Sequence, residues 1–156
     1  MLSFLTKEKP VNHAYFSPGD TCLNAILTAI NGAQNSLKIC VFTISDDRIT
    51  RAILQAHRKG IKVKILTDNE KLYDKGSDIR ELARAGVPVR VDITTNHMHH
   101  KFAILDNQTV LTGSYNWTRS AALYNHENLI STNEKTLVTD FCQEFDRLWE
   151  ELVDFS

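Results

Sequence analysis

Three histidines and a lysine lie close together near the middle of the chain, where residues 97–101 read His-Met-His-His-Lys. The run leads into an apolar segment, residues 102–105, that is typical of a short buried strand. Residues two apart in a strand point to the same face, so His99 and Lys101 are expected side by side. An imidazole can act as nucleophile, base or acid near neutral pH, and a lysine ammonium holds phosphate oxygens. The pair therefore predicts chemistry on an anionic, tetrahedral group.

Further polar residues follow the next apolar segment of the chain. Ser114 and Asn116 stand two apart just after Gly113, so both can donate hydrogen bonds to the same phosphate oxygens. Glu127 can accept a hydrogen bond from the far nitrogen of His99 and fix its tautomer, as the acid does in a catalytic triad. These residues together predict phosphoryl transfer without a metal.

A tight turn at residues 106–108 joins the two apolar segments into a hairpin. Asp106 lies an odd number of residues from Lys101, so an unbroken strand would point its side chain to the opposite face. We expect Asp106 to cap or brace the turn rather than to enter the chemistry.

The order and spacing of these residues resemble the HKD signature of the phospholipase D superfamily. The matching positions are His99, Lys101, Asp106, Gly113, Ser114, Asn116, Glu127 and Asn128. The resemblance covers most of the chain, residues 14–152, and the single signature in a short chain is similar to the small endonuclease branch of the superfamily. Asp106 and Gly113 are expected to serve the structure of the motif.

The resemblance implies a shared active site, because one signature supplies only one reactive histidine. In a two-fold homodimer, His99 of one subunit would attack phosphorus and form a phosphohistidine, while His99 of the partner subunit protonates the leaving group. The catalytic residues would be His99, Lys101 and Glu127, and the phosphate-binding residues would be Lys101, Ser114 and Asn116. No cofactor is expected.

Alternate histidines can also indicate a zinc site, since His97 and His99 share a face of the strand. No cysteine or carboxylate stands near them at ligand spacing, and Lys101 would repel a cation. The sequence therefore predicts no metal site. His97 is expected to line the substrate groove, and His100 to face the core or the opposite side of the strand.

Other groove residues are predicted from loops that follow strands, where α/β sheets bind their ligands. Asn69 and Lys71 lie in a polar loop of this kind. Tyr115 and Trp117 can stack on nucleic-acid bases, with packing in the core as the alternative for Trp117. The candidate groove residues are therefore His97, Asn69, Lys71, Tyr115 and Trp117.

Alternating strand and helix patterns must position these groups, and they predict an α/β fold. Expected strands cover residues 13–16, 36–45, 61–66, 87–93, 102–105, 110–112 and 127–131. Expected helices cover residues 20–32, 47–60, 77–86 and 137–152, with loops at 67–76 and 117–125. The pattern predicts a mixed, mostly parallel central sheet flanked by helices on both faces. One phospholipase D-like domain should span residues 1–156, with a flexible arm over residues 1–12.

Composition limits the partners and the compartment. A formal net charge of -1, with 42% hydrophobic and 24% charged residues, excludes binding of nucleic acid by bulk positive charge. A local patch must hold any polyanion. Three cysteines without paired spacing indicate thiols in a reducing compartment, and no stretch reaches the length of a membrane span. We therefore expect a cytoplasmic protein, with an exported or membrane-anchored protein as the alternative if a leader was removed.

Three function classes remain open. The first is a metal-independent endonuclease on DNA or RNA, which the compact chain with a single signature favours. The second is a phospholipid hydrolase of the cardiolipin type, which the same chemistry allows, although no amphipathic apolar helix suited to docking on a bilayer stands out. The third is a non-catalytic nucleic-acid-binding module, and the intact reactive residues argue against it.

Overall fold

The computed structural model describes residues 9–155. Its strands are β1 (Asn12–Phe16), β2 (Ser36–Val41), β3 (Ile44–Ser45), β4 (Lys62–Thr67), β5 (Val89–Val91), β6 (Lys101–Leu105), β7 (Thr109–Gly113), β8 (Trp117–Thr118), β9 (Asn128–Thr132) and β10 (Val153–Asp154). Its helices are α1 (Thr21–Gly32), α2 (Asp47–Arg58), α3 (Ile79–Arg84), α4 (Arg119–Leu123) and α5 (Lys135–Glu151), with a 3-10 helix η1 (Asn69–Leu72).

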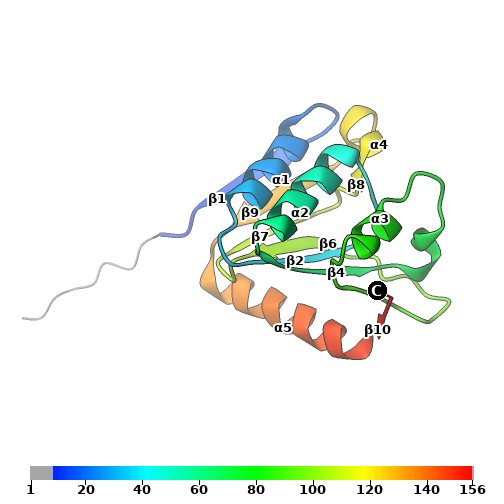
Figure 1. Ribbon diagram of the computed structural model, residues 1–156. Helices are drawn as coiled ribbons and strands as arrows, with labels where there is room; N and C mark the ends of the chain where they lie inside the picture. Colours follow the sequence, from blue (N-terminus) through cyan, green and yellow to red (C-terminus); the bar gives the residue numbers. More distant parts are fainter. Residues whose placement is uncertain (1–8, 156) are drawn as a thin grey trace, which may run out of the picture.

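An eight-stranded sheet in the order β1-β9-β7-β6-β2-β4-β5-β10 forms the centre of the fold, and helices cover both of its faces (Figure 1). The mixed α/β class and the two helical layers are as predicted. Of the expected flexible arm, residues 1–8 lie outside the described residues, while residues 9–11 have no regular structure and residue 12 already belongs to β1.

Most neighbouring strands are antiparallel, which differs from the predicted parallel majority. Within the large sheet, parallel pairing is confined to β2 with β4 and β4 with β5, and the connections between these strands carry α2 and α3. The other pairs in the large sheet, including the β6–β7 hairpin, are antiparallel. A parallel neighbour requires a crossover connection, whereas a tight turn returns the chain in the opposite direction. The sheet is therefore mixed, with few crossovers.

Alternate residues of the central strands pack on opposite faces of the sheet. Ile39 of β2 belongs to the core cluster that contains the buried side chains of α1, α2 and α3. Cys40, the next residue, belongs to the cluster that contains Phe145 and Leu148 of α5. Figure 1 shows α1 and α2 on one side of the sheet and α5 on the other. This arrangement leaves the ends of the strands free to carry the site.

Two regions predicted as loops contain short elements. The loop after β4 contains η1, and the loop expected over residues 117–125 contains β8 and α4. Trp117 of β8 pairs with Ile44 of β3 in a small parallel sheet. This pairing joins residues that are far apart along the chain, so the local pattern does not reveal it.

Candidate active site

One edge of the large sheet gathers most of the predicted reactive residues. β2, β4 and β7 end at this edge, and β6 and β9 begin there, because antiparallel neighbours run in opposite directions. Lys101 is the first residue of β6, and His99 lies two residues before it. Ser114 follows the end of β7, and Glu127 directly precedes β9. The order of strands therefore brings together residues that are separated along the chain.

The side chains of His99 and Lys101 lie together, as strand alternation predicts. Lys101 Nζ is 3.2 Å from His99 Nδ1 and 3.5 Å from His99 Nε2. It also donates a 2.8 Å hydrogen bond to the carbonyl oxygen of His99. His99 is exposed and Lys101 is half-buried. The pair thus presents an accessible imidazole beside a fixed ammonium group, which an anionic phosphate can approach from solvent.

The ring of Phe42, just after β2, contacts both reactive side chains. Its centroid lies 4.7 Å from that of His99 and 5.4 Å from that of His97. The ammonium groups of Lys71 and Lys101 lie 5.1 Å and 5.4 Å from the same centroid, within the range of cation–π attraction. From the sequence, Phe42 belongs to a central strand. Phe42 was therefore not among the predicted site residues. The feature that could have identified it is its position at the carboxyl end of that strand, where such sheets bind ligands.

Burial lowers the pKa of His99, and the neighbouring Lys101 ammonium and His97 ring lower it further. Each of these effects disfavours the positively charged imidazolium. Burial also lowers the pKa of Lys101, while the carboxylate of Glu127 acts in the opposite direction. The lowered pKa of His99 favours the uncharged imidazole, which is the form that can attack phosphorus.

Ser114 is held by groups from the start of β9. Its Oγ donates a 2.5 Å hydrogen bond to Glu127 Oε2. The same Oγ accepts hydrogen bonds from the backbone N–H and the side-chain amide of Asn128, at 3.0 Å and 3.3 Å. The second carboxylate oxygen of Glu127 accepts from Asn125 Nδ2 at 3.4 Å. The orientation of the serine hydroxyl is therefore set by three donor and acceptor groups.

Within residues 9–155 Glu127 makes no hydrogen bond to His99, contrary to the predicted triad. Its oxygens accept from Ser114 and Asn125 instead. The order β9-β7-β6 places the residue after β7 between the residue before β9 and the residues before β6. Ser114 therefore lies between the acid and the imidazole, and Glu127 orients a hydroxyl rather than the reactive ring.

Asp106 lies at the opposite end of the hairpin from His99, where it braces a neighbouring loop. Its carboxylate accepts hydrogen bonds from the backbone N–H groups of Gln34, Asn35 and Ser36, at 2.9, 2.6 and 2.9 Å. Burial raises the pKa of Asp106, but these three hydrogen bonds outweigh it and bring the pKa below its usual value. Asp106 thus anchors the start of β2 and stays out of the chemistry.

Tyr115 and Trp117 do not line a groove, which corrects the prediction that they stack on bases. They are 0% and 1% exposed and belong to the core cluster that includes Ile44. Pairing of β8 with β3 turns this segment inward. Asn116, between them, has a buried Oδ1 without a hydrogen-bond partner. Its predicted role as a phosphate donor stays a prediction.

Lys71 and Asn69 both lie in η1, at the carboxyl end of β4. Lys71 Nζ pairs with Asp74 at 2.8 Å and also contacts the Phe42 ring, so it reaches the site. The backbone N–H of Asn69 donates to Asp92 Oδ1 at 3.0 Å, and its side chain is partly buried. Asn69 therefore connects two loops, while Lys71 faces the reactive pair.

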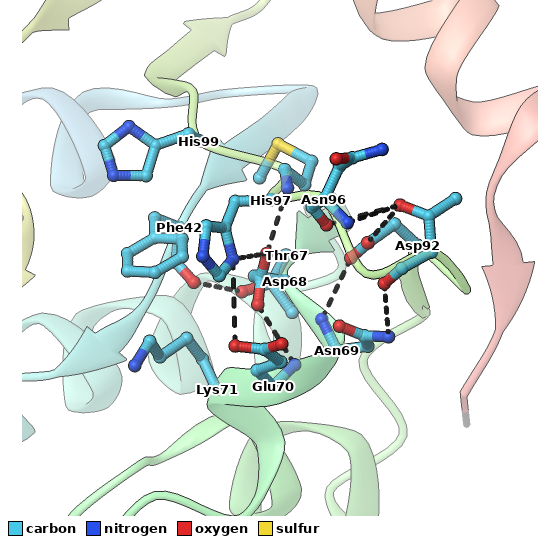
Figure 2. Close-up of polar contacts among 12 residues, drawn as sticks. Phe42, Thr67, Asp68, Asn69, Glu70, Lys71, Asp92, Asn96, His97 and His99 are labelled. Carbon is cyan, nitrogen blue, oxygen red and sulfur yellow. Dashed lines mark hydrogen bonds and ion pairs between the residues drawn. The ribbon is translucent and has the colours of Figure 1, made fainter.

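The buried carboxylate of Asp68 holds the segment that precedes His99 (Figure 2). Its Oδ2 accepts from the backbone N–H of Met98 at 2.9 Å and lies 3.2 Å from His97 Nδ1. Its Oδ1 accepts from the backbone N–H of Glu70 at 3.0 Å and so caps η1. Asp68 ties the end of β4 to the reactive run. The sequence analysis missed it, although an acid directly after a buried strand is a signal of such a role.

A cavity of about 360 Å³ lies beside His99. It is lined by His97, Met98, His99, His100, Glu144, Arg147 and Leu148. Arg147 Nη2 and Glu144 Oε1 of α5 lie 2.9 Å apart on its wall. Five of the seven lining residues have polar or charged side chains, while Met98 and Leu148 add apolar surface.

Residues 26–149 match the family model described as "Cardiolipin synthase, PLD-like domain". The mitochondrial cardiolipin hydrolase of Xenopus tropicalis is 36% identical over 173 residues, covering 97% of this chain and 82% of that protein. The mitochondrial cardiolipin hydrolase of Chlamydomonas reinhardtii is 44% identical over 138 residues, covering 88% of this chain and 62% of that protein. This chain therefore spans less than two thirds of the length of that relative.

Among solved structures, the fold is similar to that of Nuc, a phospholipase D family member from Salmonella typhimurium. The TM-score is 0.87 at 28% identity, and the match covers 94% of this chain and 99% of Nuc. NucT from Helicobacter pylori gives a TM-score of 0.86 at 27% identity, covering 94% of this chain and 100% of NucT. The whole sheet and its helices are thus shared with these proteins.

The curated relatives contradict the expected cytoplasmic location, because they are named as mitochondrial proteins. Free thiols and a short apolar N-terminus do not separate these two compartments. Within residues 9–155, the helices are too short or too polar to cross a membrane.

The family assignment depends on agreement between independent features. The family model covers most of the sequence. A relative that is 36% identical to this chain is matched over 82% of its own length. Most residues of the signature, including His99, Lys101, Ser114 and Glu127, lie at one edge of a sheet whose fold matches that of Nuc. The chain therefore belongs to the phospholipase D superfamily.

Proposed function

We propose that this protein is a metal-independent phosphodiesterase, and that it is an endonuclease on DNA or RNA. The observation that carries the proposal is the exposed His99 imidazole, held next to the Lys101 ammonium at the open edge of the sheet. A histidine in this setting can attack phosphorus, while the lysine binds a non-bridging oxygen.

The reaction requires two imidazoles, and a homodimer supplies them. The reaction starts with one His99 uncharged and His99 of the partner subunit protonated. A ring nitrogen of the uncharged His99 attacks phosphorus and the P–N bond forms. The bond to the leaving oxygen breaks as the protonated imidazole of the partner subunit donates its proton to that oxygen. The same partner imidazole then accepts a proton from water. The water oxygen bonds to phosphorus, the P–N bond breaks, and both histidines return to their starting states.

Lys101 and Ser114 would stabilise the charge that develops on the phosphoryl oxygens. Donors held in place before the reaction cost no reorganisation, and removal of one such donor typically slows an enzyme by about 10²–10³-fold. The hydrogen bonds from Asn128 and to Glu127 hold the Ser114 hydroxyl in one orientation. Ser114 has a single proton, so its hydroxyl must exchange the hydrogen bond to Glu127 for one to the phosphoryl oxygen when substrate binds.

Two observations bear on the substrate class. The match of the fold to Nuc and NucT over nearly the whole of both chains favours the endonuclease. The names of the relatives favour a second candidate, hydrolysis of cardiolipin, together with a mitochondrial location. Both substrates present the same phosphodiester to His99, so one mechanism serves both.

A substrate panel tests the proposal. The purified chain is incubated in EDTA with labelled single- and double-stranded DNA, with RNA and with cardiolipin liposomes, beside the His99→Asn variant. We expect cleavage of a nucleic acid by the wild-type protein in EDTA, and loss of at least about 10⁴-fold in the variant, because the nucleophile is gone. Wild-type reactions stopped with SDS at neutral pH should contain a phosphohistidine.

The outcomes separate the candidates. Release of phosphatidic acid from liposomes without cleavage of nucleic acid would assign the lipid substrate. Binding of nucleic acid without cleavage of any substrate would indicate a binding module. Activity that disappears in EDTA and returns with added metal, or a fully active His99→Asn variant, would overturn the mechanism. Circular dichroism of the variant controls for its folding.

A further inference from the structure

Three potential metal ligands converge beside the phosphate site, and the proposed reaction uses none of them. His97 Nδ1 lies 3.2 Å from Asp68 Oδ2 and 3.9 Å from Glu70 Oε2. One ligand atom from each residue can be chosen so that all three lie within 4.8 Å of one another. Figure 2 shows the three side chains facing a common point between η1 and the histidine run.

The fold holds these groups from two separate parts of the chain. Asp68 and Glu70 stand at the carboxyl end of β4, where Asp68 caps η1. His97 arrives with the loop that follows β5, and Asp68 holds that loop through the backbone N–H of Met98. The Asp68 side chain is 0% exposed, whereas the Glu70 and His97 side chains are 55% and 46% exposed. The cluster therefore has a fixed base and an open side.

Hydrogen bonds alone do not explain why His97 lies beside two carboxylates. His97 Nδ1 can carry only one proton, yet it faces an oxygen of each of two carboxylates. Zinc bonds to histidine nitrogen and carboxylate oxygen at about 2.0–2.2 Å, so neighbouring ligand atoms in a tetrahedral site lie about 3.3–3.5 Å apart. The separations of 3.2 Å and 3.9 Å lie on either side of this spacing.

The geometry points to a divalent transition-metal site, of the zinc class, formed by Asp68, Glu70 and His97. One imidazole and two carboxylates suit zinc, whereas magnesium and calcium prefer oxygen ligands alone. The two carboxylates carry the charge that balances a dication when His97 is neutral. Lys71 is the nearest ammonium on the same element, and its Nζ is paired with Asp74 at 2.8 Å.

The site differs from the zinc site that the sequence analysis rejected. That zinc site would have used His97 and His99, and no carboxylate stands near them at ligand spacing in the sequence. The fold supplies two carboxylates from β4 and η1 instead, and it leaves His99 with Phe42 and Lys101. An ion bound at Asp68, Glu70 and His97 takes no part in the phosphoryl transfer. It joins η1 to the histidine run and should stabilise the folded protein.

Titration with zinc chloride tests the site on the whole, tag-free chain, by isothermal calorimetry and by thermal unfolding. We expect one ion per chain and a melting temperature that rises with zinc concentration, since a ligand that binds only the folded state stabilises it. His97→Asn and Glu70→Gln should each weaken binding by at least about 10-fold, because each removes one of three ligands. Cobalt(II) should give visible d–d absorption that zinc abolishes.

Matched controls identify the residues that bind. His100→Asn changes another exposed histidine of the run, which faces Glu144, and should keep the affinity of the wild type. His99→Asn should also keep it. The proposal is wrong if zinc does not bind at one ion per chain. It is also wrong if both His97→Asn and Glu70→Gln bind as the wild type does, or if only His99→Asn loses binding. None of these outcomes depends on catalytic activity, so they are independent of the proposed function.

Discussion

The reactivity of His99 depends on which charge state its surroundings favour. Burial acts first, and the neighbouring positive charge of Lys101 acts in the same direction, so the pKa of His99 is lowered from 6.5. A lowered pKa means that the imidazole loses its proton at a lower pH than a free histidine does. The lowered pKa therefore favours the uncharged, nucleophilic form of the ring.

Titration of the His99 ring by NMR, in EDTA, should show this shift. We expect a midpoint below pH 6.5 in the wild-type protein and a higher midpoint in Lys101→Met, because that change removes one of the positive charges that oppose protonation. In the wild-type enzyme, the activity that needs neutral His99 should fall as the pH drops through this lowered pKa. A midpoint that is unchanged in Lys101→Met would mean that burial alone sets the charge state.

The contact between Glu127 and Ser114 gives the acid a role that can be separated from the imidazole. A hydrogen bond to a charged group contributes about 1.5–3 kcal/mol, and each 1.4 kcal/mol corresponds to about 10-fold in rate. If Glu127 acts by holding Ser114, removal of either partner should cost a similar part of the rate enhancement.

A double-mutant cycle measures that link. We expect Glu127→Gln and Ser114→Ala each to lower kcat by about 10–100-fold, much less than the loss in His99→Asn, and the double variant to lose little more than Ser114→Ala alone. If the kcat losses of the two single variants multiply in the double variant, Glu127 acts independently of Ser114 and has a direct role at the reacting phosphate. Circular dichroism and equal urea midpoints would show that the comparison is between folded proteins.

At the level of secondary structure, the site requires β7 and β9 to approach closely at their ends. Gly113 makes this possible, because a Cβ atom there would lie 2.2 Å from the backbone oxygen of Asn128. The same short approach lets the backbone N–H groups of Ser114 and Tyr115 donate to that oxygen, at 3.1 Å and 3.3 Å. The glycine of the signature therefore has a steric role in positioning Ser114.

Substitution of this glycine should disturb both stability and the site. We expect Gly113→Ala to lower the free energy of unfolding by about 2–3 kcal/mol, because backbone must shift to admit the methyl group. Gly32→Ala is the matched control: it lies at the end of α1 with no atom within 4 Å of an added Cβ, and should be neutral or slightly stabilising. Urea unfolding measures both. Equal stability of the two variants would remove the steric argument.

For the molecule as a whole, the proposed mechanism requires two chains, because one chain supplies a single His99. A shared site leads to a testable prediction for the activity of mixed dimers. A dimer that contains one wild-type chain and one His99→Asn chain lacks either the nucleophile or the acid, so it should be nearly inactive.

Mixing the two proteins under conditions that allow subunit exchange tests the shared site. With equal amounts, we expect the activity per wild-type chain to fall to about half, since half of the wild-type chains then pair with a variant chain. The same mixture with His13→Asn, which changes an exposed histidine of β1, should keep full activity. Undiminished activity per wild-type chain in the His99→Asn mixture would show that each subunit works alone.

The sequence by itself determined the features that depend on spacing within one element. Strand alternation placed His99 beside Lys101, because a period of two is a property of any extended chain. The Asp106–Asn107 turn follows from residue types that tolerate positive φ, and both residues have it, at 53° and 52°. The apolar stripe of α5 likewise follows from helical periodicity.

Only the tertiary structure decided which elements lie next to each other. The order β9-β7-β6 paired Glu127 with Ser114 instead of His99, and the pairing of β3 with β8 buried Trp117. The same packing brought Phe42 and Asp68 to the histidine run. These contacts join residues far apart along the chain, and spacing within an element carries no information about them. Strand order and the closure of long loops set these distances.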